Sequence, residues 1–186
     1  MAEQEPQFLV PPPRLDGPIE LSGYSSQWPV QFRAQKRRIE TALTARVLLL
    51  EHIGSTSVPG LAAKPIIDIC LAIADSADEA SYVPALEAVG FVLQAREPDW
   101  YEHRLLRHHD PSTNLHVFPV GATEIRRCLV FRDWLRSNGD DRALYESTKQ
   151  QLAARRWDYV QSYADAKTDV IAAIVARAEA HQQPTP

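Results

Sequence analysis

The chain has 186 residues, of which 45% are hydrophobic, and a formal net charge of −4 at pH 7. This length and composition favour one globular domain with a sizeable core. The acidic balance argues against a general nucleic-acid-binding protein, because binding to a phosphate backbone needs a basic face.

The two ends of the chain are expected to lie outside this domain. Residues 1–17 are rich in proline and glutamate and predict a flexible N-terminal arm, because consecutive prolines favour an extended backbone without internal hydrogen bonds. Residues 182–186 form a short tail. The predicted organisation is therefore a single domain over residues 18–181, flanked by these two segments.

The sequence favours a cytoplasmic protein without a membrane partner. No basic segment followed by an apolar segment marks the N-terminus, so we expect no signal peptide. The apolar runs fall short of the roughly 20 residues that cross a bilayer. Cys70 and Cys128 lie in apolar surroundings outside any CxxC motif, which is typical of buried free thiols in a reducing compartment.

The first half of the chain alternates between strand and helix patterns. Weak alternation at 19–24 indicates a short strand. A helix is predicted over 25–45, with Ser25 or Ser26 as its N-cap and Pro29 in its first turn. Apolar runs at 45–53 and 66–73 predict two buried strands, joined by a turn and a short helix.

The second half predicts three more strands and a helical C-terminal third. Residues 78–90 indicate a helix that Asp78 begins and Gly90 ends. Strands are expected at 91–95, 103–109 and 113–118, and long helices at 123–137, 140–156 and 158–181. The fold class is therefore α+β, with helices packed against a mixed sheet.

A glycine-serine turn follows the strand that ends at Ile53. Gly54 lets the backbone approach a ligand closely, Ser55 and Thr56 supply hydroxyl donors, and the amides of a following helix would favour an anion. These features predict a phosphate site, although the spacing of a P-loop is absent. The alternative is a tight turn whose hydroxyls merely cap the short helix.

Asp68 lies among isoleucines in the strand at 66–73. A charge in such a run needs a partner or a cation. Alternation puts Asp68 and Cys70 on one face of the strand. The carboxylate can hold Mg²⁺ beside a bound phosphate. The alternative is an ion pair with a buried cation such as Lys64.

Several segments together resemble the GrpB family of small uncharacterised bacterial proteins. They are EHIGSTSVPGLAAKPIIDI, NLHVFP, LVFRDWLRSNGDDRALYESTKQQLA and YADAKTDVIAAIVARA. The resemblance covers roughly residues 19–180. The first segment is also similar to the nucleotidyltransferase superfamily, in which an apolar-Gly-Ser turn precedes Asp-x-Asp or Asp-x-Glu on a strand. The resemblance implies a nucleotidyltransferase-like fold but no established reaction.

The chain departs from the superfamily at Cys70, which stands where a second acid is expected. A thiol is a poor ligand for Mg²⁺, whereas two-metal phosphoryl transfer uses several oxygen ligands. In the superfamily a third acid commonly comes from a neighbouring strand, and we place His116 there by hypothesis. Asp68 and His116 are thus the expected catalytic residues, and Glu51 joins them as a metal ligand. The expected cofactor is a divalent cation, Mg²⁺ or Mn²⁺, with Zn²⁺ as the alternative.

The candidate phosphate-binding residues come from the turn and from the family-like C-terminal segments. They are Gly54, Ser55, Thr56, Lys64, Arg132, Lys149 and Lys167. Guanidinium groups bind phosphate bidentately and lysine acts as a point charge, but most cations of the C-terminal third are equally consistent with solvated helix faces. His103, His108, His109 and Asp110 are expected in a strand end and hairpin loop, where exposed histidines are ordinary, rather than in a metal cluster.

Three functions remain open. The first is metal-dependent nucleotidyl or phosphoryl transfer from a nucleoside triphosphate, or another phosphorylated small molecule, to an unknown acceptor. The second is a binding module that keeps the phosphate site without transfer chemistry, which Cys70 favours. The third is a metal-dependent hydrolase built on Asp68 and His116. The oligomeric state is open as well.

Overall fold

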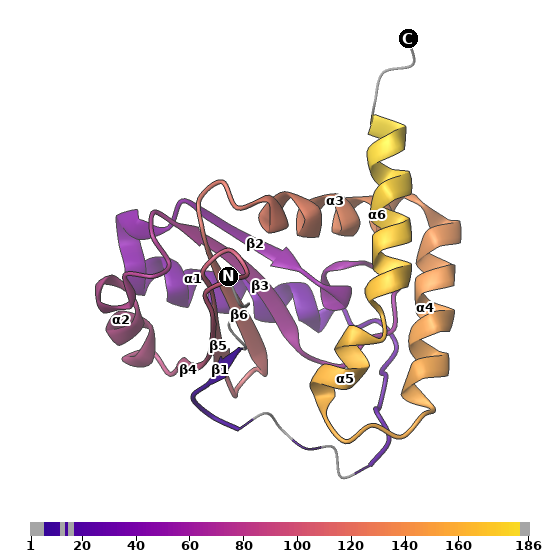
Figure 1. Cartoon of the computed structure of the whole chain (residues 1–186), viewed down its shortest axis with the longest axis horizontal. Helices are drawn as coiled ribbons and strands as arrows, with labels where there is room; N and C mark the ends of the chain where they lie inside the picture. The colour runs from indigo at the N-terminus through magenta and orange to yellow at the C-terminus, as the bar shows by residue number, and fades with distance from the viewer. Residues whose placement is uncertain (1–5, 12–13, 15–16, 183–186) are drawn as a thin grey trace.

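A computed structural model of the chain describes residues 6–11, 14 and 17–182, and it shows a mixed sheet with helices around it (Figure 1). The strand order is β1-β4-β5-β6-β3-β2. The strands are β1 (Gln7–Phe8), β2 (Leu49–Ile53), β3 (Ile67–Ile73), β4 (Val92–Glu97), β5 (His103–His108) and β6 (Thr113–Pro119). β3 and β6 run parallel, and every other neighbouring pair is antiparallel. The predicted α+β class with a mixed sheet is confirmed.

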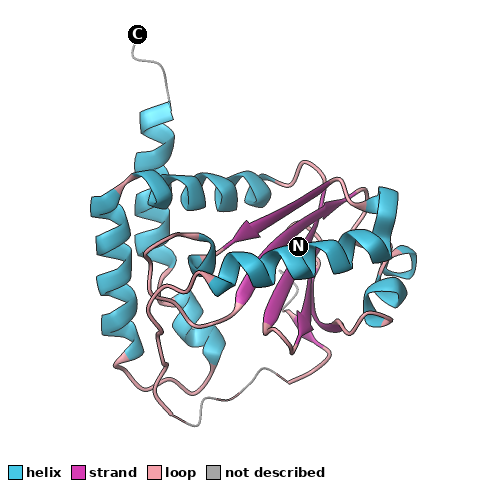
Figure 2. Cartoon of the chain, turned by 180° about the vertical axis from the view of Figure 1, so that it is seen from behind, coloured by secondary structure: helices cyan, strands magenta, loops and turns pink. Residues whose placement is uncertain are grey.

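The helices lie on both faces of the sheet and beside it. They are α1 (Gln27–Leu43), α2 (Val83–Glu87), α3 (Thr123–Ser137), α4 (Gly139–Ala153), α5 (Val160–Asp165) and α6 (Thr168–Gln182). α1 runs across one face of the sheet (Figure 2). There Ile39 and Leu43 of α1 pack with Ile69, Leu71 and Leu115 in the largest core cluster.

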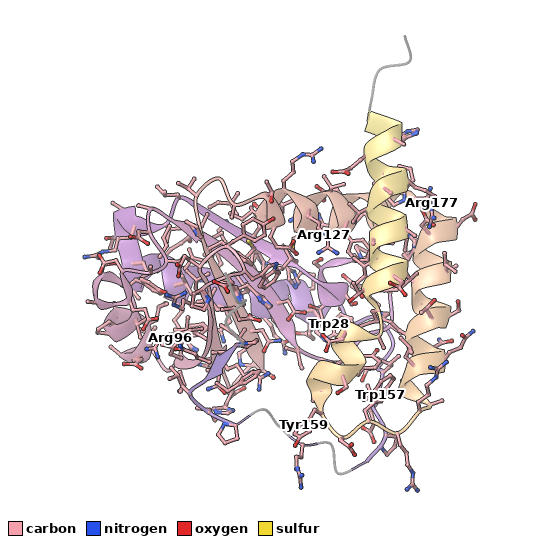
Figure 3. All side chains as sticks on the ribbon, viewed as in Figure 1. Trp28, Arg96, Arg127, Trp157, Tyr159 and Arg177 are labelled. Carbon is pink, nitrogen blue, oxygen red and sulfur yellow. The ribbon has the colours of Figure 1, made fainter. Side chains whose placement is uncertain are left out.

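The opposite face of the sheet is only partly covered. α3 packs on it through Ile125, which contacts Cys70, Ala72 and Phe118. α4, α5 and α6 stand beside the sheet, and no helix crosses the face between α3 and α5 (Figure 1). Asp141 of α4 accepts a hydrogen bond of 2.5 Å from Arg177 of α6, which ties these two helices together (Figure 3). The C-terminal helices therefore form a wall along an open part of the sheet.

The turn after β2 is shorter than the sequence predicts. In place of a short α-helix there is a single 3₁₀ turn, Ser55–Ser57. The helix cannot continue, because Pro59 lacks an amide donor and Gly60 adopts φ +80°. The expected row of helix N-terminal amides facing a phosphate is therefore absent from this turn.

Other boundaries also differ from the predicted ones. The strand predicted at 45–53 begins only at Leu49, because Thr44–Arg46 forms a 3₁₀ turn in which Thr44 adopts φ 51°. The strand predicted at 19–24 is reduced to a single bridge between Ser22 and Ala63. The helix predicted at 158–181 is divided into α5 and α6, and Lys167 lies in the break between them.

Part of the predicted N-terminal arm joins the sheet. Gln7–Phe8 forms β1 and pairs with Arg96 and Ala95 at the edge of β4. Residues 1–5, 12–13 and 15–16 of the arm, and 183–186 of the tail, lie outside the described residues. Among the helices that the structure describes, none is long and apolar enough to cross a membrane.

Candidate functional site

Asp68 lies in a polar row that crosses three strands on the open face. It is level with Asn114 of β6, which is level in turn with Arg107 of β5. The Asn114 amide donates a hydrogen bond of 2.9 Å to Oδ1 of Asp68. Nε2 of His116 lies 3.8 Å from the same oxygen, and the two side chains are 26% and 28% exposed. The structure thus places His116 beside Asp68, with both reaching solvent.

Asp68 is held as a carboxylate by its surroundings. Burial disfavours its charge, but His116, Asn114 and Lys64 together hold the pKa of this carboxyl below its usual value. Cys70, one pleat further along β3, behaves differently. Burial raises the pKa of its thiol to about 12, so it remains neutral beneath α3. A second anionic ligand on this strand is therefore missing.

The Gly54 turn packs directly against this carboxylate. Gly54 adopts φ +67°, and a Cβ added to it would overlap the Asp68 side chain. The turn is also held by Thr56, whose hydroxyl donates to the carbonyl of Ile66 at 3.0 Å and lies 3.1 Å from Nε2 of His52. Thr56 is buried, so the structure does not bring its hydroxyl to the open face.

Ser55 is the turn residue that meets the C-terminal helices. Nζ of Lys149 in α4 donates to Oγ of Ser55 at 3.2 Å and to the carbonyl of Ala62. The hydroxyl of Tyr145 also hydrogen-bonds Ser55. Lys149 is only 2% exposed, and burial together with the neighbouring Lys167 lowers its pKa to about 7. No carboxylate forms a salt bridge with this ammonium group among the described residues.

Two further lysines approach Asp68 from the side of α5. Nζ of Lys64 and Nζ of Lys167 lie 5.3 Å and 4.5 Å from the centre of the Tyr163 ring. Burial and the charge of Lys64 lower the pKa of Lys167 to about 8, although Asp68 partly offsets them. The proximity of like charges is itself a cost, which a bound anion would relieve.

Arg107 of β5 adds a fourth cation to this region. Burial lowers the pKa of its guanidinium, and the charge of Asp68 opposes this shift. Its Nε is buried and finds no hydrogen-bond partner within the described part of the chain. We define the cationic cluster as Lys64, Arg107, Lys149 and Lys167. The carboxylates whose charge acts on these four cations are Asp68, Glu146 and Asp165, so the cations outnumber them and an anionic ligand would balance the excess.

Glu51 and Arg132 are not gathered into this cluster. Nη1 of Arg132 donates to Glu51 at 2.7 Å and to the carbonyl of His52 at 3.0 Å. Both side chains line a separate cavity of about 310 Å³ between α1, β2 and α3. The expected ligand set of Asp68, His116 and Glu51 is not formed, because the Glu51 carboxylate is drawn to Arg132. Within the described ranges, no three His, Cys, Asp or Glu side chains gather to hold a metal ion.

His103 is the residue that the sequence reasoning misplaced. It was expected in an exposed strand end or loop, yet it is 1% exposed beneath Trp100 and Phe118. Its Nε2 lies 3.1 Å from Nδ1 of His116. Alternation puts His103 on the same face of β5 as Leu105, which the register pairs with His116, but the burial of His103 follows from the packing of Trp100 and Phe118 over it.

Comparison with known proteins identifies the family. Residues 18–177 match the family described as GrpB protein. The chain belongs to the GrpB family. UPF0157 protein BH1888 of Halalkalibacterium halodurans is 52% identical over 162 residues, which cover 87% of this chain and 83% of that protein.

The comparison extends to a solved GrpB structure and to a longer protein of another name. The crystal structure of the conserved protein GrpB from Enterococcus faecalis matches with a TM-score of 0.74 and 30% identity, over 86% of this chain and 96% of that one. A dephospho-CoA kinase of Mycolicibacterium paratuberculosis is 29% identical over 176 residues, which cover 81% of this chain but only 43% of that protein. These likenesses agree with the predicted family, and the names of the GrpB relatives state no reaction.

Proposed function

We propose that this GrpB protein binds a phosphorylated small molecule, such as a nucleoside triphosphate, beside Asp68 and the cationic cluster. The proposal rests on the burial of Lys149. It is a buried lysine without a carboxylate partner among the described residues, aimed at the hydroxyl of Ser55. An uncompensated buried cation is costly, and an anion beside Ser55 would provide the missing charge.

The rest of the cationic cluster supports a phosphate rather than a carboxylate ligand. Lys64, Lys167 and Arg107 approach from three different segments around Asp68. Several convergent donors suit a group with three or more acceptor oxygens and multiple charges. A relative named dephospho-CoA kinase adds support, since a kinase transfers a phosphoryl group, although the match covers 43% of that protein.

A second candidate is metal-dependent nucleotidyl transfer on a nucleotidyltransferase-like fold. The observation that favours it is the contact between the Gly54 turn and Asp68, with His116 3.8 Å from the carboxylate. These two side chains would hold a divalent cation that lowers the charge barrier between the reacting groups. The remaining ligands would have to come from the phosphates of the substrate. A hydrolase would use the same two residues, and no separate observation favours it.

The binding proposal is tested by calorimetric titration with a nucleoside triphosphate and with pyrophosphate. Lys149→Met keeps the length of the buried side chain and removes its charge. We expect at least a tenfold weaker affinity, since a charge-assisted hydrogen bond contributes about 1.5–3 kcal/mol. Lys36→Met is the matched control, because Lys36 lines the separate cavity of about 310 Å³.

Two results would contradict the proposal. One is the absence of binding by any phosphorylated ligand. The other is an equal loss of affinity in Lys149→Met and Lys36→Met. Turnover of a labelled triphosphate with Mg²⁺ or Mn²⁺, lost in Asp68→Asn, would separate transfer from binding alone.

A further inference from the structure

β2 is an edge strand of the sheet, and its free side borders the separate cavity of about 310 Å³. The amide of Ile67 donates to the carbonyl of Ser112, next to β6. Because the bonding direction alternates along a strand, the even-numbered residues of β3 bond toward β2. They pair with the odd-numbered residues of β2. The backbone groups of Leu50 and His52 therefore point to the free side of the strand.

The carbonyls on this free side are bonded, whereas the amides are not. Nζ of Lys36 donates to the carbonyl of Leu50 at 3.4 Å, and Nη1 of Arg132 donates to the carbonyl of His52 at 3.0 Å. The amides of Leu50 and His52 have no acceptor in the part of the chain that the structure describes. Leu50 is 4% exposed and His52 is 6% exposed. Two buried donors about 7 Å apart, the span of two strand residues, thus border the cavity unused.

A further β-strand is a poor occupant of this edge. An added strand donates as well as accepts, and the carbonyls that it would bond are already held by Lys36 and Arg132. The cavity of about 310 Å³ instead lies within the range of roughly 300–1,000 Å³ that small-molecule sites occupy. The edge therefore favours a small molecule that carries acceptors.

The charges around the cavity leave one cation over. Three of its four lining cations form ion pairs, which are Lys36–Glu40, Arg132–Glu51 and Arg136–Asp133. The fourth, Arg33, forms no hydrogen bond or ion pair with any residue that the structure describes. Arg33 follows Phe32, whose ring stacks on that of His52 with the ring centres 4.7 Å apart. The excess charge therefore lies at the His52 end and suits one carboxylate.

We propose that this cavity binds a small organic monocarboxylate with a second, uncharged carbonyl oxygen about 7 Å from the carboxylate, the span of two strand residues. The carboxylate accepts from the amide of His52 and from Arg33. The carbonyl oxygen accepts from the amide of Leu50. The apolar surfaces of Pro29 and Phe32 line the cavity beside the hydrocarbon part of the ligand. This site is separate from the proposed phosphate site, and neither proposal depends on the other.

The two contacts are read from the backbone amides by NMR of the ¹⁵N-labelled full chain, titrated with 5-oxohexanoate. An amide proton that gains an acceptor shifts downfield, so the signals of Leu50 and His52 should move together. The amides of Glu51 and Ile53 are the internal control, because these residues bond to β3, and their signals should move less. Hexanoate lacks the second oxygen, so it should shift His52 and leave Leu50 unchanged.

Affinity is measured by calorimetry with the same compounds and with the isomer 2-oxohexanoate, whose carbonyl is next to the carboxylate. The wild type should bind 5-oxohexanoate about fivefold more tightly than either, which is the effect of one neutral hydrogen bond. Arg33→Met should weaken binding of 5-oxohexanoate about fivefold. Arg37→Met is the matched control, because Arg37 is exposed on α1 outside the cavity and should leave the affinity unchanged.

Several results would overturn the proposal. They are the absence of binding by 5-oxohexanoate, equal affinity for the two isomers, and equal losses in Arg33→Met and Arg37→Met. A titration that shifts Glu51 and Ile53 as far as Leu50 and His52 would also contradict it. The two sites are distinguished with pyrophosphate, whose affinity should be the same in Arg33→Met and the wild type. Competition between pyrophosphate and 5-oxohexanoate would overturn the assignment of a separate site.

Discussion

Gly54 is the residue at which the turn after β2 and the carboxylate of Asp68 meet. Its φ of +67° lies in the left-handed region, and its missing side chain leaves room for the Asp68 carboxylate. Position 54 therefore requires glycine both for its left-handed backbone and for the space that the Asp68 carboxylate occupies. Gly60 shares the first but not the second, since it adopts φ +80° with open space around it. Comparing substitutions at Gly54 and Gly60 therefore separates the cost of backbone strain from the cost of a steric clash with Asp68.

Gly54→Ala should destabilise the fold more than Gly60→Ala. We expect the second change to cost about 1–2 kcal/mol, from the left-handed backbone alone. The first should add about 1–3 kcal/mol, because the new methyl group displaces the Asp68 side chain. Urea denaturation of the two variants measures the difference. Equal losses of unfolding free energy would show that Asp68 moves aside without cost.

At the scale of elements, the C-terminal helices bring two buried tyrosines to the lysines of the cationic cluster. Tyr145 of α4 lies under Lys149, with its ring centre 4.9 Å from Nζ. Tyr163 of α5 lies under Lys64 and Lys167. Their hydroxyls differ, because Tyr145 bonds Ser55 whereas the buried hydroxyl of Tyr163 finds no partner among the described residues.

Removing each hydroxyl should therefore have opposite consequences. Tyr145→Phe should cost about 1 kcal/mol, because it breaks a hydrogen bond at Ser55. Tyr163→Phe should be neutral or slightly stabilising, since a buried polar group without a partner is itself a cost. Thermal and urea unfolding of the two variants provides the measurement. A large loss for Tyr163→Phe would indicate a water or ligand bound to that hydroxyl.

For the whole molecule, the net charge of −4 contrasts with the cationic cluster of Lys64, Arg107, Lys149 and Lys167. The chain is acidic overall, so its average field repels anions. Under the proposed function, binding of a phosphorylated ligand would therefore depend on the local protonation of the cationic cluster. The pKa values of Lys149 and Lys167 are lowered to about 7 and about 8, so both titrate close to neutral pH.

Anion affinity should consequently fall as the pH rises from 6 to 9. Both ammonium groups are charged below about pH 7 and both are largely neutral at pH 9. Sulfate is a suitable probe, because it stays divalent across this range. We expect at least a tenfold loss of affinity by calorimetry, from the loss of charge-assisted hydrogen bonds.

The double variant Lys149→Met, Lys167→Met controls for the charge of the whole chain. Its histidines and termini titrate as in the wild type, while the two site lysines are gone. Its weaker sulfate binding should depend much less on pH. A wild type whose sulfate affinity is the same at pH 6 and pH 9 would contradict the assignment of these lysines to the anion site.

The sequence by itself determined the family, the α+β class and most of the strands. Apolar patterning is local, so runs such as Ile67–Ile73 identify a buried strand without knowledge of its neighbours. The glycine-serine turn followed by an aspartate on a strand also predicted Gly54, Ser55 and Asp68 as site residues. Alternation placed His116 on a definite face of its strand, and the neighbour relation of β3 and β6 brought that face to Asp68.

Only the tertiary structure decided which side chains lie together around Asp68 and Ser55. Glu51 and Arg132 form an ion pair elsewhere. Lys149 of α4 reaches the turn residue Ser55, and Lys167, between α5 and α6, comes within reach of the charge of Asp68. Such pairings depend on helix packing, which periodicity does not specify. The burial of His103 likewise depends on the packing of Trp100 and Phe118 over it. Local sequence sets the elements, and long-range packing sets the partners of each charge.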